Sequence, residues 1–126
     1  MPDLPWKVAA LASILVVEDE ALIRHLVVDT LTDEGHSVMA APSGEEALGR
    51  LNGHPPDLLI VDLRMPGMSG QEFVRRQRET GSDIPVVVLS GSSEAKQVGR
   101  ELGAIAVIHK PFDLDELVRI VKRVTD

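Results

Sequence analysis

The sequence predicts an α/β domain in which five parallel strands form one doubly wound sheet with helices on both faces. Five short aliphatic runs, each too short for a helix and rich in β-branched residues, are typical of buried strands. Amphipathic stretches with helical periodicity lie between these runs, joined by short connections. A chain that alternates strand and helix in this way forms a parallel sheet through right-handed crossovers. We therefore expect a single (βα)5 domain.

The expected strands share a length of four residues and are almost entirely apolar. They are residues 14–17, 38–41, 58–61, 86–89 and 105–108. We expect the region of residues 1–12, which contains Trp6, to be an N-terminal arm, and residues 13–126 to form the domain.

The first expected helix runs from about residue 20 to residue 34 and ends at Gly35. The residues expected on its buried face are Ile23, Leu26, Val27 and Leu31. The second and third helices each open with an S-x-x-E capping box, in which a serine precedes a glutamate by three positions. The two boxes pair Ser43 with Glu46 and Ser69 with Glu72.

The fourth expected helix carries Ala95, Val98 and Leu102 on one side and ends at Gly103. The fifth begins at Asp113, with Glu116 three positions later. The residues it is expected to bury are Leu114, Leu117, Val118, Val121 and Val124.

Composition excludes several classes of protein. The chain has 126 residues, no cysteine and a net charge of −7, so disulfides and thiolate metal sites are impossible and DNA binding is disfavoured. Aromatic residues make up only 2%, which argues against stacking on single-stranded nucleic acid. No apolar run is long enough for a membrane span, and no hydrophobic segment precedes the A-x-A-like site near residue 10. These features predict a cytoplasmic protein that does not bind membranes.

Polar side chains follow four of the expected strands. Glu18 and Asp19 follow the first strand, Asp62 the third, Ser90 the fourth and Lys110 the fifth. In open α/β sheets, ligands bind at the carboxyl ends of the strands, near the point where the strand order reverses. These five side chains meet at one edge if the strand order is 2-1-3-4-5. Three carboxylates held that close repel one another and favour a bound cation, and hard oxygen ligands suit Mg²⁺.

Four segments carry a family resemblance: "ILVVEDE", "LLIVDLRMPGMSG", "VVVLSG" and "VIHKPF". In this order and at this spacing, the sequence resembles a receiver domain of bacterial two-component response regulators over residues 13 to about 124. The resemblance implies a flavodoxin-like fold with strand order 2-1-3-4-5. It also implies a stand-alone receiver that accepts a phosphoryl group from a histidine kinase or a phosphotransfer protein and signals to a downstream protein target. Such a protein promotes only its own phosphorylation and dephosphorylation.

The resemblance assigns a role to each residue of the site. Asp62 is the phospho-acceptor, and Asp19, Asp62 and the backbone carbonyl of Arg64 ligate Mg²⁺, with Glu18 reaching the ion through water. Lys110 contacts the phosphoryl group, and the Lys110–Pro111 bond is expected to be cis. Ser90 occupies the position whose hydroxyl draws in the following loop.

Two features of the switch remain open. The position three residues before Lys110 is usually aromatic in the family, and here it is Val107. We interpret Val107 as a packed strand residue, which leaves open how phosphorylation would change the face formed by the fourth helix, fifth strand and fifth helix. Pairing of two copies through that face also stays open.

Three other functions compete with this interpretation. An aspartyl-phosphate phosphatase of the haloacid-dehalogenase type would need a second Asp two positions after Asp62, where this chain has Arg64. A nucleotide-binding domain would need a glycine-rich loop after the first strand, where this chain has "VEDE". A receiver that works without phosphorylation is disfavoured because all five site positions hold competent residues.

Overall fold

The computed structural model describes residues 11–126 and shows one five-stranded parallel sheet in the order β2-β1-β3-β4-β5. The strands are β1 (Ser13–Val17), β2 (Ser37–Ala41), β3 (Leu58–Asp62), β4 (Val86–Ser90) and β5 (Ala106–His109). The helices are α1 (Ala21–Asp33), α2 (Gly44–Arg50), α3 (Gly70–Glu79), α4 (Ala95–Glu101) and α5 (Leu114–Thr125). The predicted fold class and strand order are confirmed. Trp6 lies outside the described residues.

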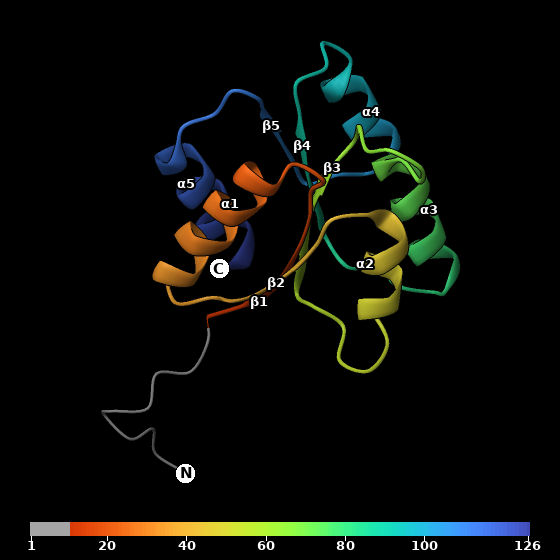
Figure 1. The fold of residues 1–126 in the computed structure, drawn as a ribbon, viewed down its shortest axis with the longest axis horizontal. Coiled ribbons are helices and arrows are strands. Elements are labelled where there is room, and N and C mark those ends of the chain that lie inside the picture. The colour runs from red at the N-terminus through yellow and green to blue at the C-terminus, as the bar shows by residue number, and fades with distance from the viewer. Residues whose placement is uncertain (1–10) are drawn as a thin grey trace.

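The sheet separates two layers of helices. Helices α1 and α5 cover one face, and α2, α3 and α4 cover the other (Figure 1). Successive residues of a strand point to opposite faces, so β1 contributes Ile14 and Val16 to one apolar core and Leu15 and Val17 to the other. Strands β1, β3 and β4 are therefore almost wholly buried, which explains their continuous aliphatic sequence.

The register of the sheet places the carboxyl ends of its central strands level with one another. Val17 pairs with Val61, Asp62 with Leu89, and Ser90 with His109. The residues at these ends therefore converge on one edge of the sheet.

The serine of each predicted capping box caps its helix, at the starts of α2 and α3. The hydroxyl of Ser43 accepts a hydrogen bond from the Glu46 N–H, and that of Ser69 accepts one from the Glu72 N–H. Asp113 caps α5 in the same way, accepting from the Glu116 N–H at 2.6 Å. Each cap satisfies an N–H group that would otherwise have no partner inside the helix.

Three side chains expected in the core are exposed. Leu26 is 44% exposed, because it lies at the border of the apolar stripe of α1 while Val27 and Leu31 fill its centre. Leu114, 39% exposed, is the first residue of α5, and the buried face of that helix begins at Leu117. Ile105 is 47% exposed and precedes β5, which starts one residue later than expected.

Val107 packs against α4 at very short range. Gly99 of α4 is buried, and a β-carbon at that position would lie only 2.7 Å from Cγ2 of Val107. The interpretation of Val107 as a packed strand residue is consistent with its partly buried position beside the core under α2, α3 and α4. The absence of a side chain at position 99 lets α4 lie directly on this strand.

None of the helices in residues 11–126 combines the length and apolar character needed to cross a bilayer.

Candidate functional site

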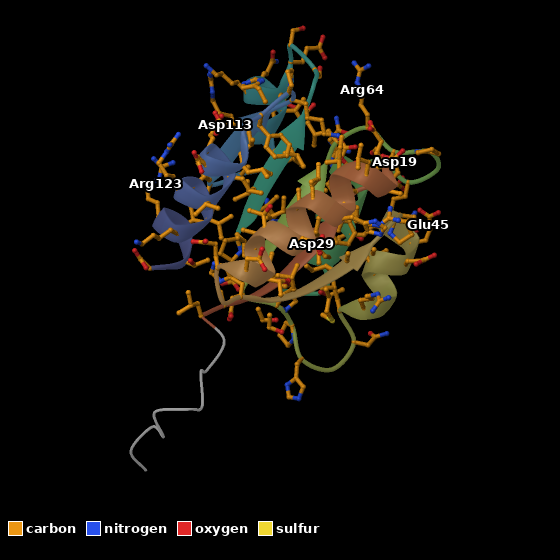
Figure 2. All side chains as sticks on the ribbon, turned by 60° about the vertical axis from the view of Figure 1, so that its left-hand side comes forward. Asp19, Asp29, Glu45, Arg64, Asp113 and Arg123 are labelled. Carbon is orange, nitrogen blue, oxygen red and sulfur yellow. The ribbon has the colours of Figure 1, made fainter. Side chains whose placement is uncertain are left out.

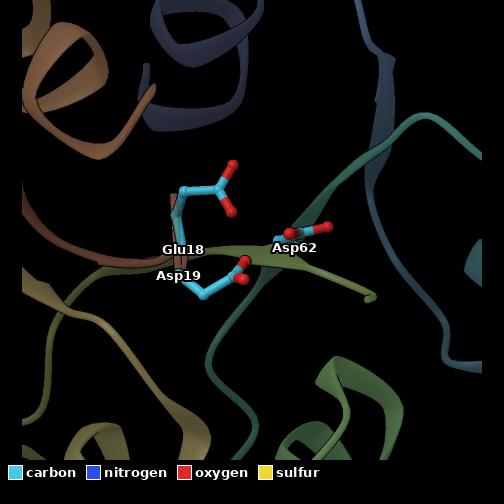
Figure 3. Close-up of side chains that lie close together, drawn as sticks. All are labelled: Glu18, Asp19 and Asp62. Atoms are coloured by element: carbon cyan, nitrogen blue, oxygen red, sulfur yellow. The ribbon is translucent and has the colours of Figure 1, made fainter. Parts of the chain in front are cut away.

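Three carboxylates meet at the carboxyl end of the sheet. Glu18 and Asp19 follow β1 directly, and Asp62 is the last residue of β3. Each offers an oxygen atom within 4.8 Å of the others. Figure 3 shows the Glu18 and Asp19 side chains extending toward Asp62. The predicted convergence of these acids is therefore present in the structure.

Lys110 joins this cluster from the end of β5, an edge strand of the sheet. It follows β5, and its peptide bond to Pro111 is cis. Its ammonium Nζ lies 2.6 Å from Oε1 of Glu18 and 3.3 Å from Oδ2 of Asp62. The side chain is only 17% exposed, so these pairs are poorly screened by solvent.

Burial and mutual contact shift the ionisation of this group. Burial, together with the neighbouring carboxyl group of Asp62, raises the pKa of Glu18 to about 8, against the opposing effect of Lys110. Burial alone lowers the pKa of the Lys110 ammonium, but its hydrogen bond to Glu18 and the charge of Asp62 outweigh that effect, so the pKa is raised. One ammonium does not balance three carboxylates, which disfavours full ionisation of the cluster.

The same residues fit a hard divalent cation. Oε2 of Glu18 is buried and has no hydrogen-bond partner among the described residues. A buried carboxylate oxygen without a partner is costly, and either a coordinated ion or its bound water would supply the missing partner. Closely spaced carboxylate oxygens are the ligands that Mg²⁺ prefers.

The loop after β3 is fixed against the strand end. The Arg64 N–H donates a hydrogen bond to Oδ1 of Asp62 at 3.2 Å, and the Met68 N–H donates to Oε1 of Glu45 on α2 at 3.3 Å. Figure 2 shows the side chain of Arg64 extending outward from the body of the protein. Position 64 therefore contributes its backbone to the site and no acidic group.

Ser90 lies at the end of β4 with its side chain fully buried. Its Oγ accepts a hydrogen bond from the Ser92 N–H at 3.0 Å, and Oγ of Ser92 accepts one from the Glu94 N–H at 3.1 Å. These bonds link the strand end to the start of α4. The hydroxyl hydrogen of Ser90 remains available for another acceptor.

Arg24 is a site residue that the sequence reasoning missed. Its Nη1 donates hydrogen bonds to the backbone carbonyls of Glu18 at 2.9 Å and of Asp19 at 3.2 Å. The periodicity of α1 places Arg24 on neither the buried face nor the strand end, so pattern alone did not select it. A basic residue one turn into the helix that follows an acidic strand end is the available signal.

Comparison with known proteins gives a consistent set of relatives. A protein-family model described as the response regulator receiver domain matches residues 14–122. The two-component response regulator PhoP of Pseudomonas aeruginosa is 42% identical over 106 residues, which cover 82% of this chain and 47% of PhoP. This chain thus spans about half the length of that relative. The sporulation initiation phosphotransferase F of Bacillus subtilis is 35% identical over 112 residues, covering 87% of this chain and 90% of that protein.

A solved structure extends the similarity to three dimensions. The chemotaxis protein CheY4 of Vibrio cholerae superposes with a TM-score of 0.80 at 37% identity, covering 91% of this chain and 99% of that one.

Proposed function

Because this chain belongs to the response regulator receiver family of two-component systems, we propose that it accepts a phosphoryl group on Asp62 and signals through the resulting change in its surface. The observation that carries the proposal is the meeting of Asp62 with two further carboxylates and one ammonium at the same strand ends. A lone carboxylate at a strand tip has many uses, whereas this combination balances the charges of a phosphoryl group and a metal ion.

Mg²⁺ is the proposed cofactor. Asp19, Asp62 and the backbone carbonyl of Arg64 would hold the ion, and Glu18 would contact it through water. The unpartnered Oε2 of Glu18 and the close approach of the three carboxylates support this assignment. When bound, Mg²⁺ neutralises negative charge on the phosphoryl oxygens.

In the proposed transfer, a carboxylate oxygen of Asp62 attacks the phosphorus atom of a phosphohistidine, and the phosphorus–nitrogen bond breaks. The electron pair of that bond stays on the imidazole nitrogen of the donor, which can then take up a proton. Asp62 becomes an acyl phosphate. The strand holds the Asp62 side chain rigidly, because β3 is buried on both faces. Lys110 already contacts Oδ2 of Asp62 and would receive a phosphoryl oxygen as a point charge. The Ser90 hydroxyl would donate to another oxygen.

The proposed partners are a histidine kinase or a histidine phosphotransfer protein on the input side and a protein target on the output side. The output would be a change in the face formed by α4, β5 and α5, driven through the Ser90–Ser92 link. The net charge of −7 supports a protein rather than a nucleic acid as the target. Membership of the receiver family supports a cytoplasmic location. Pairing of two copies through that same face would be compatible with this output. The chain would promote only its own phosphorylation and dephosphorylation.

Intact-mass measurement after incubation with acetyl phosphate and Mg²⁺ tests the phosphorylation site. We expect one added phosphoryl group on the wild-type chain and none on Asp62→Asn, which keeps the shape of the side chain but is a poor nucleophile. Omission of Mg²⁺ should reduce labelling of the wild type. Equal labelling of Asp62→Asn and the wild type would move the acceptor to another residue.

A further inference from the structure

Arg24 ties together the backbone of the two acids that follow β1. It is the fourth residue of α1 and is partly buried. A single guanidinium nitrogen, Nη1, donates to the carbonyl oxygens of both Glu18 and Asp19. Because these two carbonyls belong to consecutive residues, the pair of bonds fixes the direction in which the chain leaves the strand.

The connection between β1 and α1 lacks the capping serine found at the starts of α2 and α3. Helices α2 and α3 begin with serine side chains that cap the first turn, whereas Glu20, the N-cap of α1, makes no side-chain cap hydrogen bond. The Glu18 N–H is held by the carbonyl of Ala41 in β2. Arg24 holds the opposite end of the same residue, its carbonyl, and also the carbonyl of the next residue.

We propose that Arg24 is a positioning residue that sets the orientation of the Glu18 and Asp19 carboxylates for cation binding. The inference rests on the proposed function, because it assigns to Arg24 a role in the same metal site. Groups that orient metal ligands without touching the metal contribute strongly to affinity, since the ligands must otherwise be ordered when the metal binds.

Charge and geometry predict opposite effects for this residue. A guanidinium beside a cation site repels the cation, so an arginine acting only through its charge would weaken Mg²⁺ binding. Its removal would then strengthen binding. An arginine that acts by holding the two carbonyls would strengthen Mg²⁺ binding, and its removal would weaken it. The sign of the change in affinity therefore separates the two roles.

Calorimetric titration of the phosphate-free chain with MgCl₂ provides the test. We expect Arg24→Gln to weaken Mg²⁺ binding by roughly 10- to 100-fold, the range seen when partners of metal ligands are removed. Arg24→Lys, which keeps the charge and can reach at most part of the arrangement, should fall between Arg24→Gln and the wild type. Arg75→Gln, which removes an exposed arginine from α3, is the control for lost charge and should bind as the wild type does.

A second comparison separates positioning from general destabilisation. Val28→Ala shortens a partly buried apolar side chain of α1 that packs on the core and carries no polar group to bind the two carbonyls. Urea unfolding of the metal-free proteins measures how far each substitution lowers stability. We expect Val28→Ala to keep wild-type Mg²⁺ affinity even where its stability is as low as that of Arg24→Gln.

Each alternative result has one meaning. Unchanged or tighter Mg²⁺ binding by Arg24→Gln, or an equal loss in Val28→Ala, would overturn the role of Arg24 while leaving the proposed function intact. A wild-type chain that takes up no Mg²⁺ and is not labelled on Asp62 would overturn the proposed function, and this inference with it.

Discussion

Lys110 Nζ donates a hydrogen bond to Glu18 Oε1 at 2.6 Å, between residues separated by 92 positions in the chain. The pair joins the end of β1 to the residue after β5, across the width of the sheet occupied by β3 and β4. Lys110 thereby supplies the only ammonium that pairs with the acidic cluster in residues 11–126. A metal ion bound in the site would supply Glu18 with a second positively charged neighbour besides that ammonium.

Proton release should accompany Mg²⁺ binding. Burial raises the pKa of Glu18 to about 8, so at pH 7 the metal-free site holds a proton that a nearby divalent cation would displace. We expect Mg²⁺ affinity to rise with pH between 6 and 8, by at most about tenfold per pH unit for a single displaced proton. Calorimetry in two buffers of different ionisation enthalpy measures the release. Glu18→Gln should abolish it, and an equal release from that variant would assign the proton elsewhere.

The free energy of unfolding of the metal-free protein should depend on pH through the same ionisation of Glu18. The pKa of Glu18 lies near 8 in the folded chain and has an ordinary value of 4.5. Between these two values the folded state binds a proton that the unfolded state has released, so the free energy of unfolding falls as pH rises through this window. Urea unfolding in EDTA at pH 5.5 and pH 8.5 measures this change.

Glu18→Gln is the matched control for that measurement. Its stability should fall less than that of the wild type between the two pH values, because the titrating carboxyl is gone. A wild-type protein that becomes more stable relative to Glu18→Gln at the higher pH would contradict the assigned ionisation.

Lys110→Ala should separate metal binding from signalling. The substitution removes the ammonium but leaves the three carboxylates, so we expect Mg²⁺ binding to persist. We expect phosphorylation to lose its effect on amide hydrogen exchange in α4, because the contact that would draw the phosphoryl group toward the β5 side is missing. Lys122→Ala, which alters an exposed lysine on α5, should respond as the wild type does. Unchanged exchange in α4 of the phosphorylated wild type would contradict the coupling.

The contact between Gly99 and Val107 should appear as an energetic coupling. A methyl group at position 99 would lie 2.7 Å from Cγ2 of Val107, a stiff β-branched side chain. We expect Gly99→Ala to lower the free energy of unfolding by about 1–2 kcal/mol, because overpacking outweighs the better helix propensity of alanine. In a Val107→Ala background the same change should become stabilising, by at most about 1 kcal/mol.

A double-mutant cycle measured by urea unfolding gives this coupling directly. Additive effects of the two substitutions would show that α4 and β5 adjust to each other without strain.

The sequence was sufficient for the sheet and for the convergence of the site. Strands such as β3 and β4 are buried on both faces, so their continuous aliphatic runs are unambiguous, and a polar residue such as Asp62 or Ser90 marks the end of each one. Once the strand order is known, residues at neighbouring strand ends must lie close together.

Other features depend on geometry that a periodic pattern does not contain. Leu26 and Leu114 have apolar side chains at positions next to the buried stripe, and only the docking angle of each helix decides whether they are covered. The reach of Arg24 to two carbonyls depends on the rotamer of a long side chain. The contact of Gly99 with Val107 depends on how closely α4 approaches the sheet.

The close contact at Gly70 bears on which helix would move if the end of β3 were displaced. A β-carbon at this first residue of α3 would lie 2.2 Å from the carbonyl oxygen of Asp62, so the helix start and the strand end are in direct backbone contact. Asp62 is therefore backed by α3, and a shift of Asp62 toward α3 would have to move the whole helix. On the opposite side, Ser90 is linked to α4 through single hydrogen bonds in a short loop. A displacement of Asp62 would therefore be transmitted more easily to the loop between β4 and α4 than to α3.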